Sequence, residues 1–334
     1  MTTFTDLHRS DFDFNTLATP FGGFGDILWR DHAGNDVLWL MNINSPSSVA
    51  TLPDVTPGWH VKAAAEFDLP ELGFNSDDIL WQNDNGALAL WRMNGTTIVI
   101  NHALPNPGPT WHVVGDYDFN GDLKDDIFFQ HDSGALAIWT ISNAQFGTVS
   151  GMFAGIQNPG PTWHVVGTGD TDGDQRAGIL WQNDSGALAI WENPVFVNMP
   201  FIGDIFIFNT VAALPTVDAS WHVKGMADVS GNGRADVVFQ NDSGAVAIWE
   251  MGGAGGTTIN AANLVNINPG PTWHIAGLRD MDGDGHADIL FQNDNGAAAI
   301  WENYQSLGGG SATFNGLLAV TPNPNPNGHV WDLL

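Results

Sequence analysis

One stretch of residues recurs six times along this chain, and this repetition constrains the fold more than any other feature. The closing tryptophans of the copies are 48 to 58 residues apart. Self-similarity with a period of this size is typical of repeat architectures. The copies, numbered here as repeats one to six, are GDILWRDHAGNDVLW (25–39), DDILWQNDNGALALW (77–91), DDIFFQHDSGALAIW (125–139), AGILWQNDSGALAIW (177–191), ADVVFQNDSGAVAIW (235–249) and ADILFQNDNGAAAIW (287–301).

Each repeat is predicted to contain four short strands. A Trp-His-Val or Trp-His-Ile motif, as in WHVVG (111–115), is the first strand, and DILWQ (78–82) is typical of the second. NDNG or NDSG then provides the Asn, Asp and Gly that a tight hairpin turn needs. ALAIW-type residues form the third strand, and a weaker fourth follows, such as TTIVI (96–100). No segment shows a helical period.

Four strands per unit of about 50 residues predict the blades of a propeller. We therefore expect an all-β fold, a six-bladed β-propeller with four-stranded blades, forming a single domain over 1–334. A parallel β-helix would have shorter repeats, and separate sandwiches would not recur so regularly. The expected blades are approximately 11–58 with 327–334, 59–110, 111–162, 163–220, 221–272 and 273–326.

The chain ends indicate how the ring closes. The first repeat has no Trp-His-Val strand ahead of it, whereas Gly328-His329-Val330 aligns with that motif near the C-terminus. We expect this last strand to complete the sheet of the first repeat, which would leave no exposed sheet edge.

The loop between the first and second strands carries the clearest chemical motif, DMDGDGHAD at 280–288. Asp280, Asp282, Asp284 and Asp288 would supply side-chain oxygens, and His286 its backbone carbonyl. Oxygen ligands at alternating positions are typical of calcium sites. The loop is not an EF-hand, because Phe291 stands where a bidentate Glu is required.

Three other loops repeat this pattern with variations. The alternative, that they are only polar turns rich in Asp and Gly, explains one loop better than four in register. In the fourth repeat, Gly178 replaces the closing Asp, so that site should be weaker or completed by water. In 66–78 and 11–26 the spacing is too long for the pattern. The predicted ligands are Asp118, Asn120, Asp122, Lys124 and Asp126; Asp170, Asp172, Asp174 and Arg176; and Asp228, Ser230, Asn232, Arg234 and Asp236, with Lys124, Arg176 and Arg234 contributing backbone carbonyls.

The charge balance suits a chain that binds cations. The chain has 9 Lys plus Arg against 37 Asp plus Glu, a formal net charge of −28. This excess argues against nucleic acid and anionic membrane surfaces as partners, and no apolar run is long enough for membrane insertion. Without metal the clustered acids would repel one another, so we expect folding to depend on calcium.

These residues resemble the FG-GAP/VCBS family of repeats, found in bacterial extracellular proteins and in integrin α-subunit propellers. The motifs at 280–288 and 118–126 and the strand pair GILWQNDSGALAIW (178–191) carry the resemblance, which extends over nearly the whole chain. It implies a propeller with calcium in its loops, whereas function varies widely within the family. Propeller lectins of mushrooms that bind N-acetylglucosamine are distantly similar, but this sequence lacks their basic residues around the sugar.

The strand order places the hairpin turns and the Trp-His motifs on the face opposite the Asp loops. Tryptophan stacks on sugar rings and Asp binds hydroxyls, so this face could hold several weak glycan sites. The alternative is that these tryptophans pack between blades, as large repeated aromatics usually do; the closing tryptophans, Trp39 to Trp301, fit that alternative better still. The candidate ligand residues are Trp59, Trp111, Trp163, Trp221, Trp273, Asp84, Asp132, Asp184, Asp242 and Asp294.

One histidine follows each of these tryptophans, and His329 stands in the C-terminal motif. Around a ring they would be too far apart to share one metal unless they lined a narrow channel, so a repeated structural hydrogen bond is the preferred interpretation. The histidines are His60, His112, His164, His222, His274 and His329.

The sequence favours a secreted binding module for glycans or cell-surface polymers, with calcium as cofactor. No motif of an enzyme active site is present. The alternatives are a protein-interaction or adhesion propeller and, less favoured, a polysaccharide-cleaving enzyme. We expect an extracellular or cell-surface location, although the first residues contain no Sec signal.

Overall fold

The computed structural model describes residues 25–31, 33–67, 77–122, 124–143, 148–155, 157–199, 203–323 and 331–333. These residues form strands, turns and no helix, so the all-β prediction is confirmed for them. In particular, this part of the chain has no helix with the length and hydropathy to cross a membrane. The strands are β1 (Ile27–Asp31), β2 (Asp36–Asn42), β3 (Ser45–Thr51), β4 (Trp59–Ala65), β5 (Asp78–Asn83), β6 (Leu88–Asn94), β7 (Thr97–Leu104), β8 (Trp111–Tyr117), β9 (Asp126–His131), β10 (Leu136–Asn143), β11 (Thr148–Gly155), β12 (Trp163–Gly169), β13 (Gly178–Asn183), β14 (Leu188–Met199), β15 (Gly203–Leu214), β16 (Trp221–Ala227), β17 (Asp236–Asn241), β18 (Val246–Gly252), β19 (Thr258–Val265), β20 (Trp273–Arg279), β21 (Asp288–Asn293), β22 (Ala298–Gly308), β23 (Ser311–Ala319) and β24 (Trp331–Leu333).

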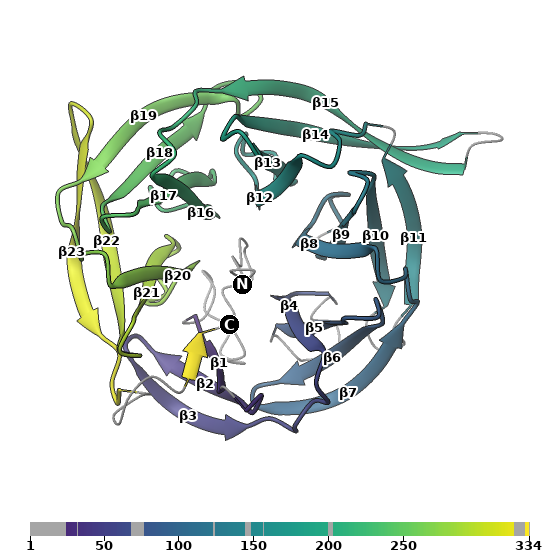
Figure 1. Ribbon diagram of the computed structural model, residues 1–334, viewed down its shortest axis with the longest axis horizontal. Helices are drawn as coiled ribbons and strands as arrows, with labels where there is room; N and C mark the ends of the chain where they lie inside the picture. The colour runs from purple at the N-terminus through teal and green to yellow at the C-terminus, as the bar shows by residue number, and fades with distance from the viewer. Residues whose placement is uncertain are drawn as a thin grey trace.

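The strands form a ring of sheets, a β-propeller (Figure 1). Strands β4, β8, β12, β16 and β20 lie toward the centre, and β3, β7, β11, β15, β19 and β23 form the periphery. Hydrogen bonds join them into two four-stranded sheets, β24-β1-β2-β3 and β4-β5-β6-β7, and two eight-stranded sheets over β8–β15 and β16–β23. Each eight-stranded sheet consists of two antiparallel runs of four strands joined by one parallel pair, β11–β15 or β19–β23.

The hairpin turns between the second and third strands follow the predicted chemistry. In the second repeat, Gly86 has φ 86° and its amide donates to the Asn83 carbonyl at 2.8 Å. A Cβ at this position would also lie 2.2 Å from the carbonyl carbon of Gly108. Glycine is therefore required both by the backbone conformation and by the close approach of the next repeat.

The hydrophobic core is divided among the junctions between neighbouring repeats. Six clusters of buried residues occur in the described ranges, and each combines side chains of two adjacent repeats. One cluster joins Trp29 of the first repeat to Leu290 of the sixth. The second strand of each repeat lies between two neighbours, and its Trp or Phe is buried on both sides, as Trp81 and Trp181 are. This explains why DILWQ is a continuous apolar run rather than an alternating one.

The first and last repeats are joined at the C-terminal strand. Strand β24 pairs antiparallel with β1, with Trp331 opposite Asp31. Trp59 stands opposite Asn83 in the second repeat in the same way. The position of the Trp-His-Val motif therefore belongs to residues 331–333 and not to 328–330, which lie outside the described residues. The Gly25 amide also donates to the Asp280 carbonyl at 2.6 Å across this junction.

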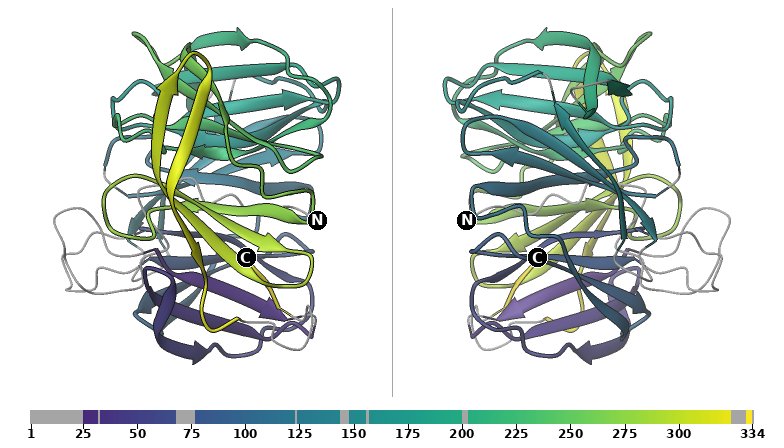
Figure 2. Two further views of the ribbon diagram at one scale, coloured as in Figure 1. Left: turned by 90° about the vertical axis from the view of Figure 1, so that its left-hand side faces the viewer. Right: turned by 90° about the vertical axis from the view of Figure 1, so that its right-hand side faces the viewer.

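Two long hairpins reach across the periphery to a neighbouring repeat. Strands β14 and β15 each have 12 residues, and the start of β15, at Ile205 and Phe206, pairs with β11 of the third repeat. Phe206 of β15 contacts Phe128 and Phe196, with ring centroids 6.3 Å away in each case. The β22–β23 hairpin, yellow in Figure 2, extends in the same way along β19 of the fifth repeat.

Candidate metal loops and ligand-binding face

The strand register separates two candidate sites. In the third repeat, Trp111 at the start of β8 pairs with His131 at the end of β9, beside the hairpin turn. At the other end of the same strands, Tyr117 pairs with Asp126, beside the Asp loop. The ring therefore has an Asp-loop face and a Trp-His face, as predicted from the strand order.

The Asp loop of the sixth repeat brings three carboxylates together. One oxygen each of Asp280, Asp282 and Asp288 lies within 4.8 Å of the others. Backbone amides orient them: Asp280 Oδ1 accepts from Gly283 at 2.7 Å, Asp280 Oδ2 from Gly285 at 2.7 Å and Asp288 Oδ2 from Met281 at 2.9 Å. This donor set of hard oxygens fits a calcium ion.

Burial opposes ionisation in this loop. Removal from water, together with the charges of Asp282, Asp280 and Asp284, raises the pKa of Asp288 to about 9. The pKa of Asp280 is raised to about 6, again mainly by burial. A divalent cation would offset both effects, because it compensates desolvation and repulsion together.

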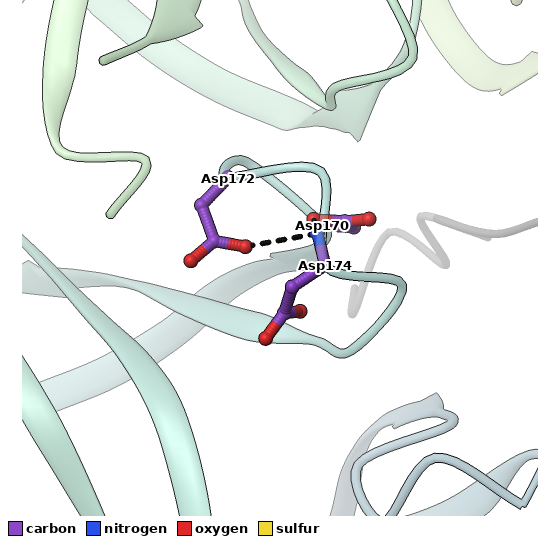
Figure 3. A group of neighbouring side chains, drawn as sticks. All are labelled: Asp170, Asp172 and Asp174. Carbon is purple, nitrogen blue, oxygen red and sulfur yellow. Dashed lines mark hydrogen bonds between the residues drawn. The ribbon is translucent and has the colours of Figure 1, made fainter. Parts of the chain in front are cut away.

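The fourth repeat holds a second such group, shown in Figure 3, where three side chains project from one short loop. Oxygens of Asp170, Asp172 and Asp174 lie within 4.8 Å of one another. Asp170 accepts from the amides of Gly173 at 2.6 Å and Gln175 at 2.7 Å. The loop is thus folded around the first carboxylate, as the loop of the sixth repeat is.

The closing position of this loop is occupied from another strand. A Cβ on Gly178 would lie 2.0 Å from Oε1 of Glu192, a residue of β14 that is 1% exposed. Thr171 Oγ1 donates a hydrogen bond to Glu192 Oε1. Burial, with the charges of Asp172, Asp170 and Asp174, raises the pKa of Glu192 to about 9. Nothing in the sequence distinguishes Glu192, because Glu250 and Glu302 follow the closing Trp in the same way.

The other two predicted loops are less compact. Among the described residues, only the loops of the fourth and sixth repeats bring three carboxylates within 4.8 Å. In the third repeat, Asp118 Oδ1 accepts from Gly121 at 2.6 Å, and Lys124 Nζ lies 3.5 Å from Asp122 Oδ2. Asn120 Nδ2 donates to Asp126, whose pKa burial raises well above its usual value.

The loop of the fifth repeat has fewer charges and a similar fold. Asp228 accepts from the amides of Asn232 at 2.9 Å and Gly233 at 2.7 Å. Ser230 donates its amide to Asp236 at 2.8 Å, and burial raises the pKa of Asp236 to about 7. The carbonyl roles of Lys124, Arg176, Arg234 and His286 stay predictions. The irregular loops at 11–26 and 66–78 lie mostly outside the described residues.

The first Asp of a loop also connects neighbouring repeats. The carbonyl of Asp170 accepts from Ala235 of the fifth repeat at 2.6 Å, and that of Asp228 from Ala287 of the sixth at 2.8 Å. The Asp280 carbonyl accepts from Gly25 of the first repeat at 2.6 Å. Any ion that fixes these loops would therefore also fix the junctions between repeats.

On the Trp-His face, five histidines make the same hydrogen bond, which confirms the predicted structural role. His329 lies outside the described residues. Each bond joins the histidine Nε2 to the aspartate Oδ1 of the hairpin turn in the same repeat, at 2.7 to 2.8 Å. Both partners are exposed to solvent. The pairs are His60–Asp84, His112–Asp132, His164–Asp184, His222–Asp242 and His274–Asp294.

The tryptophans of this face are half-buried. Each packs against the cluster at the junction with the preceding repeat, as the packing alternative predicted, and keeps part of its surface in solvent. Of the closing tryptophans, Trp191 and Trp249 are half-buried and the other four are buried. The half-buried residues of the Trp-His face are Trp59, Trp111, Trp163, Trp221 and Trp273.

A family model described as an FG-GAP-like repeat matches residues 228–291, which hold the Asp loops of the fifth and sixth repeats. The resemblance inferred from the sequence motifs is confirmed. No curated protein matches the chain. One solved structure, named "Crystal Structure of Mitotic Checkpoint Complex", contains a chain with 13% identity and a TM-score of 0.44, covering 95% of this chain and 79% of that one. Similarity at this level carries no inference about this protein.

Proposed function

We propose that this FG-GAP-repeat propeller is a secreted binding module, stabilised by calcium in its Asp loops, that recognises carbohydrate on its Trp-His face. We further infer that its ring has six four-stranded blades. The two eight-stranded sheets support this count, because each divides into two antiparallel runs of four strands joined only at the periphery. The FG-GAP-like repeat by itself favours a general role in binding.

The observation that carries the proposal is a polar pair repeated five times beside a half-exposed tryptophan. In the third repeat, His112 holds Oδ1 of Asp132, whose side chain remains 59% exposed. A carboxylate oriented in this way can accept hydrogen bonds from sugar hydroxyls, and the exposed part of Trp111 offers an apolar surface to a sugar ring. Five equivalent weak sites on one face would give a polymer high avidity.

Calcium supports this function from the opposite face. The donor sets of the fourth and sixth repeats are oxygen-rich and partly desolvated, which is the chemistry that calcium requires. Its role would be to neutralise the loops and to hold neighbouring repeats in register. Extracellular calcium is abundant enough to occupy sites of modest affinity, which is consistent with secretion.

A glycan array probed with calcium-loaded protein tests the proposal. We expect binding to at least one polysaccharide class, reduced about tenfold or more by combined Asp132→Asn, Asp184→Asn and Asp242→Asn substitutions, because three of five sites are weakened. Asp204→Asn, on the peripheral β15 hairpin, is the control and should leave binding unchanged. Absence of binding to every glycan, or equal binding by the triple variant, would refute carbohydrate recognition.

A protein-interaction module is the second candidate, favoured by a different surface. The peripheral strands expose aliphatic side chains, including Val99 of β7, Val211 of β15 and Leu264 of β19. If immobilised matrix proteins bind the propeller and Val99→Lys with Val211→Lys abolishes that binding, the periphery is the functional surface. The same double variant should retain glycan binding if the Trp-His face is responsible.

A further inference from the structure

The Asp loop of the fourth repeat lacks the residue that closes the other predicted loops. In the third, fifth and sixth repeats this position is held by Asp126, Asp236 and Asp288, all nearly inaccessible to solvent. Each accepts an amide hydrogen from its own loop, from Phe119, Ser230 or Met281. Gly178 has no side chain to do this, although oxygens of Asp170, Asp172 and Asp174 lie within 4.8 Å of one another; in the sixth repeat the equally compact group includes the closing Asp288.

The carboxyl group of Glu192 lies where the missing side chain would begin. A Cβ built on Gly178 would be 2.0 Å from Oε1, 2.1 Å from Cδ and 2.2 Å from Oε2 of Glu192. An aspartate at position 178 and this conformation of Glu192 are therefore mutually exclusive. The Glu192 side chain is also held toward the loop by the hydroxyl of Thr171, a loop residue.

The neighbouring residue adds a second link between β14 and this loop. Asn193 has a positive φ of 58°, and its Nδ2 donates to Oδ2 of Asp172 at 3.4 Å. In the fifth repeat, the residue at the corresponding position is Met251, whose backbone amide donates to Asp236. In the fifth repeat the third strand thus contacts the closing Asp through a backbone amide. In the fourth repeat it contacts the loop through the side chains of Glu192 and Asn193 instead.

We propose that Glu192 is the closing ligand of the fourth-repeat loop and supplies, from the third strand of the repeat, the carboxylate that Gly178 lacks. The inference rests on the proposed binding of calcium by these loops. With Glu192, this loop has four carboxylates, the same number as Asp280, Asp282, Asp284 and Asp288 provide in the sixth repeat. Calcium takes six to eight oxygens and accepts carboxylates from flexible positions. The site is therefore complete rather than weakened or closed by water.

The same position in the fifth repeat shows that this arrangement is specific. Glu250 also follows the closing Trp, but its Oε1 accepts from Tyr304 at 2.8 Å and Asn263 at 2.7 Å. It binds these peripheral residues while Asp236 closes its loop. In the fifth repeat the glutamate at this point therefore does not belong to the loop, and Glu250 is a matched control.

Native mass spectrometry and competition with a chromophoric chelator, on the full chain, measure the number and affinity of bound calcium ions. We expect Glu192→Gln to lose one ion or to weaken one site by about tenfold or more, because a neutral amide replaces a charged ligand. Glu250→Gln should keep both the number of ions and their affinities. If Glu192 has only a structural role, Glu192→Gln retains every ion, and the proposal is overturned.

A compensating pair of substitutions provides a sharper test. Gly178→Asp alone should lower the melting temperature, because its side chain overlaps the Glu192 carboxylate. Glu192→Ala alone should lose the ion. The combined variant should recover both the ion and the melting temperature, since the carboxylate introduced at position 178 would then fill the vacated space. Failure of the double variant to bind more tightly than Glu192→Ala contradicts the inference.

These outcomes separate the inference from the proposed function on which it rests. If the unsubstituted protein binds no calcium, the proposal that the Asp loops bind calcium is wrong, and so is the assignment of Glu192 as a ligand. If it binds calcium and Asp174→Asn removes one ion while Glu192→Gln does not, the loop is a metal site and only the assignment of Glu192 is wrong.

Discussion

At the scale of single residues, the main feature of this protein is a set of buried carboxylates that water does not solvate. Asp236, Asp280, Asp288 and Glu192 all have pKa values raised primarily by burial. Ionising these carboxyl groups is costly in the folded state, so each loop is destabilised when two or three of its carboxyl groups carry a negative charge. A bound cation reverses this balance, which makes pH the natural variable with which to test the loops.

Without calcium, the folded protein should lose stability as pH rises from about 4 to about 9. The pKa values of Asp288 and Glu192, each about 9, exceed those of the unfolded chain, 3.8 and 4.5. The folded state therefore holds protons that the unfolded chain has released, and its stability falls with pH across that window. Thermal melts in EDTA between pH 5 and 9 measure this trend.

Calcium should remove that trend, because metal binding requires the deprotonated carboxylates and becomes stronger as pH rises. The variant Asp288→Asn is the control. It should show a shallower decline in EDTA and a smaller gain from calcium. A melting temperature in EDTA that is constant or rising up to pH 9 contradicts the assignment of these buried acids.

The sequence predicted residue chemistry well where each copy of the repeat is self-contained. The His–Asp pairs follow from one motif and one turn within a repeat, and a hydrogen bond was the expected outcome. Glu192 could not be predicted in this way. Its role depends on the absence of a side chain at Gly178, and the repeat alignment does not show that the third strand reaches the loop.

At the scale of elements, the junctions between repeats rely on a glutamine that the sequence analysis left unexplained. In three of the repeats, the Gln that ends the second strand donates to the carbonyl of the next repeat's Trp. Gln82 bonds Trp111, Gln130 bonds Trp163 and Gln240 bonds Trp273, at 2.6 to 2.8 Å. The alignment marks these glutamines as equivalent but does not reveal that their partners lie in the following repeat.

Two of these glutamines also accept a hydrogen bond, so each one clamps the next inner strand at two points. Gln240 Oε1 accepts from the Ile275 amide at 2.9 Å. In the first repeat, Arg30 takes the same role, donating to the Trp59 carbonyl at 2.9 Å while paired with Asp36. This replacement explains why the first repeat has Arg30 where the other five second strands end in Gln.

Gln240→Ala should destabilise the protein by about 1–3 kcal/mol, because it leaves the buried Ile275 amide without its acceptor. Chemical denaturation in the presence of calcium measures the change. Gln182→Ala is the matched control, since no side-chain hydrogen bond joins Gln182 to the next repeat in the described part of the chain, and its cost should be clearly smaller. An equal decrease in the free energy of unfolding in the two variants would mean that the hydrogen bonds of Gln240 contribute nothing beyond packing.

At the scale of the whole molecule, the all-β architecture was predictable, whereas the pattern of inter-repeat links was not. Tandem equivalence predicts a ring of like units. The structure instead links the third repeat to the fourth and the fifth to the sixth through long hairpins, with the sixth joined to the first by β24. These differences come from segments such as 194–208 and 303–316, which lie outside the aligned motifs.

Removing residues 331–334 should open the ring at the first repeat. Deletion leaves the edge of β1 without its partner strand and should cost about 2–4 kcal/mol in lost hydrogen bonds. Hydrogen exchange measured by mass spectrometry should accelerate in β1 and little in β5, whose sheet does not include β24. An increase spread evenly over both strands would show that β24 is not the closure.

The uneven linking of the ring has a mechanical consequence. Hydrogen-bonded strand pairs cross two of the six junctions, third to fourth and fifth to sixth, and β24 ties the end of the chain to the first repeat. Within the described ranges, those between the first and second, second and third, and fourth and fifth repeats contain only side-chain packing and isolated polar contacts. Under tension the repeats should separate first at these three junctions. The second repeat would then separate alone, the third and fourth repeats as a pair, and the fifth, sixth and first repeats together with both chain ends. A ring built from six similar repeats would therefore divide into three blocks of unequal size.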